Sequence, residues 1–186
     1  IVATGSFDYL PVFENNDIPG VMLGGGVRRL LHLYGVKPGT CAVVVSHNDT
    51  GLALACELID AQIPVTAVVD SRLAPNEENN SIKRLRDQGV ELFFSYALEA
   101  AHGKNYVQGA SVISTDALRR SFPRVRHFIP CDLICVAADE TPAGALIAQS
   151  GGELAYDAAL GKMTPRRLPS HIFCAGAVTG INHLSA

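Results

Sequence analysis

The sequence predicts an α/β fold: a Rossmann-like parallel sheet covered by helices, with a small antiparallel meander. Three apolar runs, at residues 41–45, 65–69 and 129–138, have the length expected of buried strands. Between the first two runs, residues 52–63 repeat apolar side chains at helical spacing. Strands that alternate with helices in this way are typical of βαβ units, whose strands lie parallel in one sheet.

The other elements follow from apolar periodicity and from turn residues. Residues 1–5 indicate the end of a buried strand, and because a strand needs a neighbour, we expect the chain to begin inside a larger domain. The turn residues between 8 and 20 predict an irregular connection. Further helices are expected at 27–34, 82–88 and 143–150, a strand at 90–95, a hairpin or meander at 103–116, and a strand followed by a glycine-rich turn at 171–180.

The composition is that of a globular protein with ample material for a core. Of 186 residues, 48% are apolar, and 15 Lys and Arg residues stand against 18 Asp and Glu, for a net charge of −3. Without a basic block, we expect no nucleic acid and no anionic membrane among the partners. No apolar run approaches the ~18 residues of a membrane-spanning helix. Five scattered cysteines fit buried thiols in a reducing compartment, so a cytoplasmic location is expected.

The turn after the first apolar run is where a nucleotide would bind in a βαβ unit. The usual fingerprint there is G-x-G-x-x-G, with an acidic residue about 20 positions later that binds ribose hydroxyls. Gly51 occupies the third glycine position and Asp70 the position of the ribose acid, whereas Ser46 and Asn48 replace the first two glycines. The Asn48 side chain obstructs the pyrophosphate, and the charge of Asp49 opposes an anion by roughly 1–4 kcal/mol. Two interpretations are therefore open: a nucleotide site that uses Gly51 and Asp70, or a Rossmann-like unit without a nucleotide.

Few other residues suggest chemistry. The histidines are dispersed, and neither a metal-binding motif nor a Ser/His/Asp order is present, so we assign no metal ligand and no catalytic residue. His47 is the histidine nearest a plausible cleft, and a solvated loop position is its simpler explanation. Asp132, at the start of a strand, is expected to orient backbone groups or contact a neighbour.

Several segments, taken in order, resemble the alpha subunit of heterotetrameric sarcosine oxidase, within the class of flavoproteins with two dinucleotide domains. They are ATG at 3–5, VFENNDIPGVML at 12–23, VRRLLHLYGVKPG at 27–39, VSHND at 45–49, AVVDSR at 67–72, CDLICVA at 131–137 and FCAGAVTG at 173–180. The resemblance extends over nearly the whole chain. It implies that the fold is of the FAD/NAD(P)-binding type and that the chain is an internal piece of a longer subunit.

The resemblance also implies a domain organisation and a cofactor. Residues 27–127 would form an inserted second dinucleotide-like domain, and residues 1–26 and 128–186 would be remnants of an incomplete first FAD/NAD-binding domain. NAD would bind in that first domain, beside Thr4, Gly5 and Gly176, although the G-x-G-x-x-G motif expected upstream is not in this chain. Ala177 stands where flavoproteins of the wider class have an Asp that contacts the cofactor. FAD and FMN are therefore expected in the whole complex and not on this piece.

The function implied is a part in the oxidative demethylation of sarcosine to glycine. The chain would support a dinucleotide site and pack against the other subunits of a heterotetrameric oxidase, without carrying the catalytic residues. Two alternatives stay open: a non-catalytic scaffold or interaction module with a vestigial Rossmann fold, and an NAD(P)H-dependent reductase domain that uses Gly51 and Asp70. Unpaired strand edges would also favour association between copies of the chain.

Overall fold

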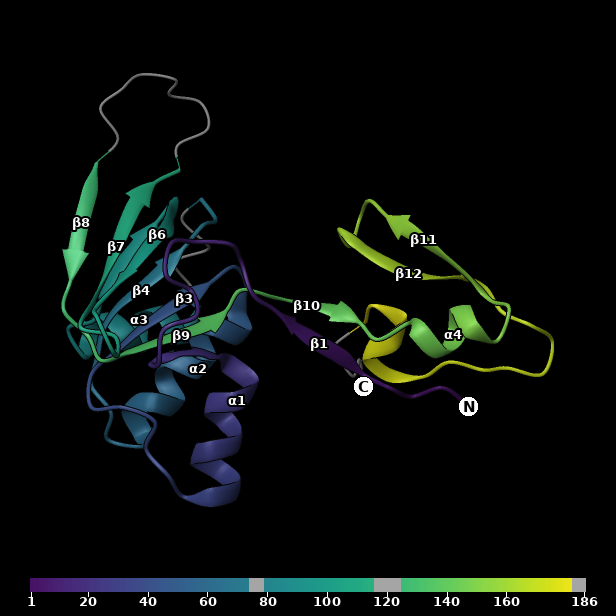
Figure 1. Ribbon diagram of the computed structural model, residues 1–186, viewed down its shortest axis with the longest axis horizontal. Coiled ribbons are helices and arrows are strands. Elements are labelled where there is room, and N and C mark those ends of the chain that lie inside the picture. Colours follow the sequence, from purple (N-terminus) through teal and green to yellow (C-terminus); the bar gives the residue numbers. More distant parts are fainter. Residues whose placement is uncertain (74–78, 116–124, 182–186) are drawn as a thin grey trace. The chain divides into compact units, whose positions relative to one another are not determined.

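The computed structural model describes residues 1–73, 79–115 and 125–181 (Figure 1). The chain divides into two compact units. The larger unit comprises residues 10–139, and the smaller one combines residues 1–9 with residues 140–186. Each unit is described by itself.

The larger unit is built on a five-stranded parallel sheet with the strand order β2-β9-β3-β4-β5. Its strands are β2 (Val21–Leu23), β3 (Ala42–Ser46), β4 (Val65–Asp70), β5 (Glu91–Phe94) and β9 (Leu133–Ala137). Every residue of β3 is buried, because this central strand is covered on both faces. A strand covered in this way needs apolar side chains on both faces, which explains the continuous apolar run in its sequence.

The two faces of this sheet are covered differently. Helices cover one face, and an antiparallel meander covers the other, so successive residues of β3 enter two separate apolar cores: Val44 packs with the helices and Val43 with the meander. Figure 1 shows α1 and α2 below the sheet. The helical elements are α1 (Gly24–Arg28), continued by the π-helical η1 (Arg29–Leu33), α2 (Asp49–Asp60) and α3 (Asn80–Asp87). The meander strands are β6 (Tyr96–His102), β7 (Gly109–Ser114) and β8 (Arg126–Ile129).

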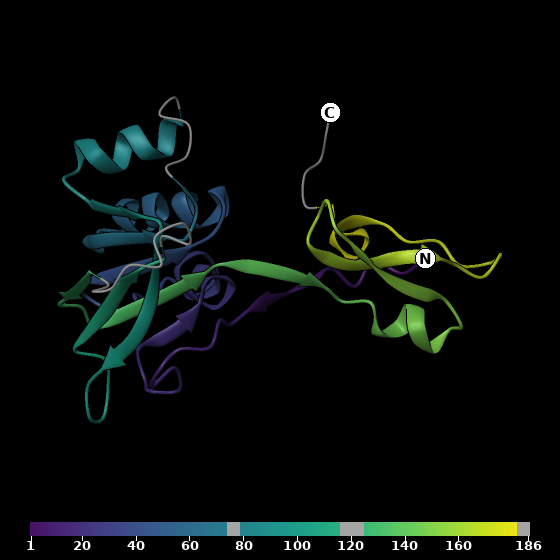
Figure 2. The same ribbon diagram turned by 90° about the horizontal axis from the view of Figure 1, so that it is seen from above.

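The smaller unit contains short elements and little buried apolar surface. Its elements are β1 (Ser6–Tyr9), which pairs with β10 (Asp139–Pro142), then α4 (Ala145–Gln149), the antiparallel hairpin β11 (Glu153–Asp157) and β12 (Lys162–Arg167), and the 3₁₀ helix η2 (Gly176–Thr179). The hairpin lies beside α4 in both views (Figures 1 and 2). Among the described residues of this unit, the buried apolar side chains are Pro142, Ala143, Ile147 and Val178.

The structure confirms the predicted parallel sheet, its helices and its meander. The strands expected at 41–45, 65–69 and 90–95 are β3, β4 and β5, and the helix expected at 52–63 is α2, which begins earlier, at Asp49. The meander is larger than the segment 103–116, because β6 and β8 flank β7 on both sides.

Four expectations about elements were wrong. Residues 1–5 are not a strand, because Val2 forms only an isolated parallel bridge, with Cys174. The strand expected at 171–180 is likewise reduced to this bridge at Cys174. The connection 8–20 contains the end of β1, and the short strand β2 was not predicted. The strand expected at 129–138 is β9, but it begins only at Leu133: residue 129 is the last of β8, which ends before Pro130, because proline lacks a backbone N–H for a ladder.

The larger unit is wider than the inserted domain expected at 27–127. Both β2 and β9 lie outside that range, yet they pair in the same sheet as β3, so residues 10–139 form one compact body. The assignment of the chain to an inserted dinucleotide-like domain and the remnants of another stays a prediction.

Candidate functional site

The candidate nucleotide site lies where β3 and β4 end side by side. Ser46 and Asp70 are register partners at the carboxyl ends of these parallel strands, and the turn from Ser46 leads into α2. Ligands of open α/β sheets bind at this edge. The structure therefore brings the sequence-predicted residues Gly51 and Asp70 to the same edge of the sheet.

Asn48 is the N-cap of α2. Its side-chain oxygen accepts hydrogen bonds from the backbone N–H groups of Thr50, at 3.0 Å, and Gly51, at 3.3 Å, and its amide nitrogen donates to the carbonyl of Ala138 at 3.2 Å. The free N–H groups of a helix N-terminus are the groups that bind a phosphate. Here two of them already have an intramolecular acceptor.

Gly51 allows close packing of the helix against the strand. A Cβ atom at this position would lie 2.4 Å from Oγ and 2.6 Å from Cβ of Ser46, closer than real Cβ contacts come. Helix–strand packing is the role of the third glycine in the dinucleotide fingerprint. Gly51 thus keeps that structural role whether or not a nucleotide binds.

Asp70 is fully buried, and its carboxylate is held by Arg72. Arg72 donates from its backbone N–H at 2.9 Å, from Nε at 3.1 Å and from Nη2 at 2.8 Å, while its Nη1 donates to Asp49 at 2.9 Å. The hydrogen bond to Asp70 is the main cause that raises the pKa of Arg72, and the bond to Asp49 adds to it. The carboxylate predicted to bind ribose therefore already has charged donors.

Arg72 is the residue that sequence reasoning missed. It stands two positions after Asp70, in the segment AVVDSR, and 23 positions after Asp49, so no local motif joins the three. The one signal in the sequence was that the acidic residues Asp49 and Asp70, at the two turns, have a nearby cation in Arg72. His47, in contrast, lies where it was expected: it is exposed, and its Nδ1 is 2.5 Å from Oγ of Ser71.

Asp132 orients backbone groups, one of the two roles expected for it. It lies at the opposite edge of the sheet, where its carboxylate accepts from the hydroxyl of Thr40 at 2.6 Å and from the N–H groups of Thr40 at 2.9 Å and Cys41 at 2.8 Å. Burial alone would raise the pKa of Asp132, but these hydrogen bonds outweigh it and hold the pKa below its usual range. Asp132 thus fastens the start of β3 to the start of β9.

Thr4, Gly5 and Gly176 belong to the smaller unit. The isolated parallel bridge between Val2 and Cys174 holds the segment that contains Thr4 and Gly5 beside the segment that contains Gly176. Oγ1 of Thr4 also donates to the carbonyl of Ala143 at 2.8 Å. Gly5 has φ +72° and Gly176 has φ +75°, a backbone conformation that favours glycine, and a Cβ atom at either position would meet open space. Bare backbone beside open space can accept a bulky anion.

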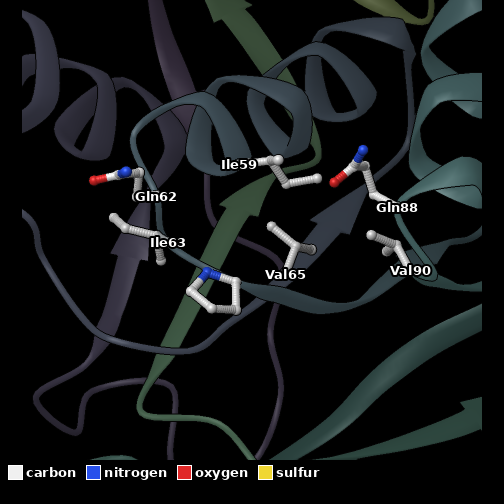
Figure 3. A pocket seen from close by; sticks show the side chains of 7 residues that line it. Ile59, Gln62, Ile63, Val65, Gln88 and Val90 are labelled. Atoms are coloured by element: carbon white, nitrogen blue, oxygen red, sulfur yellow. The ribbon is translucent and has the colours of Figure 1, made fainter.

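The larger unit also has a hollow of about 370 Å³. It is lined by Ile59, Gln62, Ile63, Pro64, Val65, Gln88 and Val90. Figure 3 shows the two glutamine amides on opposite sides, with Ile59 and Val65 between them. These residues come from the end of α2 and from the starts of β4 and β5, so the hollow lies at the amino ends of the strands, away from the edge where ligands of such sheets bind.

Other kinds of site find little support. All five cysteines are free, and no group of three or more His, Cys, Asp or Glu side chains that could hold a metal occurs in the described ranges. None of the helices described is long and apolar enough to cross a membrane.

Comparison with known proteins gives similarity along almost the whole chain. The chain is 30% identical over 182 residues to sarcosine oxidase subunit alpha of Corynebacterium sp. strain P-1, a match that covers 97% of the chain. A second relative, sarcosine oxidase subunit alpha of Rhizobium meliloti strain 1021, is 42% identical over 90 residues, 48% of the chain. The resemblance to sarcosine oxidase alpha subunits is confirmed. The chain spans only 18% and 9% of the lengths of these two relatives, and no family model matches it.

Solved structures confirm the fold class. Thioredoxin reductase of T. acidophilum matches with a TM-score of 0.71 at 13% identity, over 95% of this chain and 56% of its own. A FAD-dependent pyridine nucleotide-disulphide oxidoreductase from Desulfovibrio vulgaris matches with 0.67 at 20% identity, over 95% and 45%. L-proline dehydrogenase of P. horikoshii matches with 0.60 at 22% identity, over 95% and 29%. At these identities the likeness shows the FAD/NAD(P)-binding type of fold that this chain shares with them.

Proposed function

We propose that the chain is part of the alpha subunit of a sarcosine-oxidase-like complex, which demethylates sarcosine oxidatively to glycine. The observation that supports this most is the similarity to sarcosine oxidase alpha subunits over 97% of the chain. Because the chain spans 18% of that relative, the proposal assigns the activity to the assembled complex. The chain itself supports a dinucleotide site and packs against its neighbours, and it carries no catalytic residue.

The dinucleotide site of this proposal lies in the smaller unit. Gly5 and Gly176 offer bare backbone beside open space, which fits the close approach of a pyrophosphate, and Thr4 precedes Gly5 in the same segment. The turn at Ser46–Gly51 fits a dinucleotide poorly, because Asn48 already accepts from two N–H groups of α2. The proposal therefore assigns NAD to the place beside Gly5 and Gly176, and FAD and FMN to the rest of the complex.

Packing is supported by the exposed apolar side chains of the smaller unit. Among the residues of this unit that the structure describes, nine large apolar side chains are exposed: Ile1, Phe7, Tyr9, Leu146, Tyr156, Leu160, Met163, Phe173 and Ile181. Isolated exposed apolar residues are normal, but so many beside so few buried ones indicate a surface that another part of an assembly covers. Other segments or subunits of the oxidase are the proposed neighbours.

The experiment compares three glycines in the assembled complex. Gly5→Ala and Gly176→Ala each place a methyl group at the proposed NAD site, and Gly89→Ala is the matched control, because Gly89 also has a positive φ, +74°, and open space around it. All three variants should lose similar stability, since each strains the backbone by about 1–2 kcal/mol. Only the first two should lose bound NAD, which is measured after acid release from the purified complex.

Two results would contradict the proposal. Wild-type NAD content in Gly5→Ala and Gly176→Ala would remove the assigned site, and a complex that consumes no oxygen with sarcosine would remove the assigned reaction. An assembled complex without any NAD would favour the second candidate function, a non-catalytic interaction module, which the exposed apolar residues also support.

A further inference from the structure

We infer that the larger unit is closed to dinucleotides by its own side chains: Asn48 and Arg72 occupy the two places where the pyrophosphate and the ribose of a dinucleotide would be recognised. This inference concerns residues 10–139 and does not depend on the proposed NAD site in the smaller unit. It rests on three contacts at the carboxyl edge of the sheet.

The first contact replaces the pyrophosphate. A phosphate at a helix N-terminus accepts hydrogen bonds from the first free N–H groups of the helix. In α2 the side-chain oxygen of Asn48 accepts from the N–H groups of Thr50 and Gly51. Asn48 also donates to the carbonyl of Ala138, beside the end of β9, so the amide is held at both of its polar atoms. A pyrophosphate would have to displace a side chain that is already in place.

The second contact replaces the ribose. An acidic residue at the end of the second strand normally accepts from the ribose hydroxyls. Here the fully buried carboxylate of Asp70 accepts from three N–H groups of Arg72. A buried carboxylate is stable only with a charged or well-placed partner, and breaking such a pair is strongly destabilising. Ribose hydroxyls are neutral donors and compete poorly with a guanidinium that the chain holds in position.

The third contact joins the first two places. Nη1 of Arg72 donates to Asp49, in the first turn of α2, while Nε and Nη2 of the same side chain hold Asp70 after β4. Arg72 therefore bridges the helix N-terminus and the end of the neighbouring strand, across the edge of the sheet where a dinucleotide would bind.

The experiment follows the backbone amide NMR signals of the 186-residue chain during titration with NAD or with ADP-ribose. Three forms are compared: the wild type, the double variant Asn48→Gly and Arg72→Ala, and the control Arg84→Ala, which removes another Arg–Asp pair of the same unit, the one with Asp60. The amides of residues 46–51 should not shift in the wild type or the control. In the double variant they should shift saturably, with an affinity at least tenfold higher than in the wild type.

The readout by residue separates this inference from the proposed function. NAD that binds beside Gly5 and Gly176 shifts amides of the smaller unit equally in all three forms. Saturable shifts at 46–51 in the wild type, or a folded double variant without shifts there, would overturn the inference. If the double variant does not fold, Asn48→Gly alone tests the place of the pyrophosphate, because glycine is tolerated at an N-cap and frees the same two N–H groups. Saturable shifts at 46–51 in this variant would support that part of the inference, and their absence would overturn it.

Discussion

Replacing Gly51 by Ala should destabilise the larger unit, although alanine is the better helix former. The added Cβ would lie 2.4 Å from Oγ and 2.6 Å from Cβ of Ser46, and 3.1 Å from the carbonyl oxygen of Ala137. Overpacking of this kind costs about 1–3 kcal/mol. The hydrogen bond that Ser46 donates to the carbonyl of Asn48, worth about 1 kcal/mol, is lost if Ser46 turns away. Against these losses, the helix propensity of alanine returns at most about 1 kcal/mol.

The net loss expected for Gly51→Ala is about 1–3 kcal/mol, measured as the free energy of unfolding in urea. For a chain of this size each kcal/mol corresponds to about 2–4 °C in melting temperature. Gly26→Ala is the control, because the nearest atom to its added Cβ, Cε of Met22, is 4.0 Å away, and this variant should be neutral or slightly more stable. A melting temperature for Gly51→Ala equal to that of Gly26→Ala would refute the packing argument.

Three further predictions concern charged groups and thiols. Asp132→Asn should lower the free energy of unfolding at pH 7 by about 1–2 kcal/mol. Because the pKa of Asp132 is lowered in the folded chain, urea melts should show the difference between variant and wild type shrinking below pH ~4. A difference that stays constant with pH would be evidence against the role of the Asp132 carboxylate. Glu57→Gln removes the carboxylate that accepts from Arg28 at 3.0 Å and should lower the free energy of unfolding by less than about 1 kcal/mol, as a thermal melt can measure. Because salt screens this pair, the loss should be smaller still in high salt, and a larger loss in high salt would contradict the prediction. Burial raises the pKa of Cys131 and of Cys135 to about 12, so iodoacetamide at pH 8 should modify both only after unfolding, as mass spectrometry can test; alkylation of the folded chain would disprove it.

The fold could be predicted where strands are buried on both faces. The central strands β3 and β4 are recognisable as apolar runs in the sequence, because helices cover one face of the sheet and the meander covers the other, so both faces of these strands are buried. The short edge strand β2 has only three residues and no such signal, since its burial depends on pairing with β9, far away in the sequence. The apolar residues 1–5 misled for the opposite reason: apolar character alone does not supply a strand neighbour.

The sequence could predict where the candidate site lies in the fold, but not which side chains contact each other there. The fingerprint spacing placed Gly51 and Asp70 at one edge of the sheet, and an Asn before an apolar helical pattern is a known N-cap signal. The bridge by Arg72 was not predictable, because it joins Asp49 and Asp70 from two different βα turns. Such a pairing depends on the register of β3 and β4, which no local pattern specifies.

The position of β9 in the sheet constrains the order of folding. It pairs with β2 on one side and with β3 on the other, although it follows both by about a hundred residues. A ribosome that releases the chain from its N-terminus therefore exposes β3, β4 and β5 before the strand that separates β3 from β2 has been made. Until residue 137 has emerged, the edge of β3 has no partner, and non-local pairing of this kind slows folding and exposes strand edges to aggregation. A chaperone that shields this edge would thus have its greatest effect during synthesis, before β9 is complete.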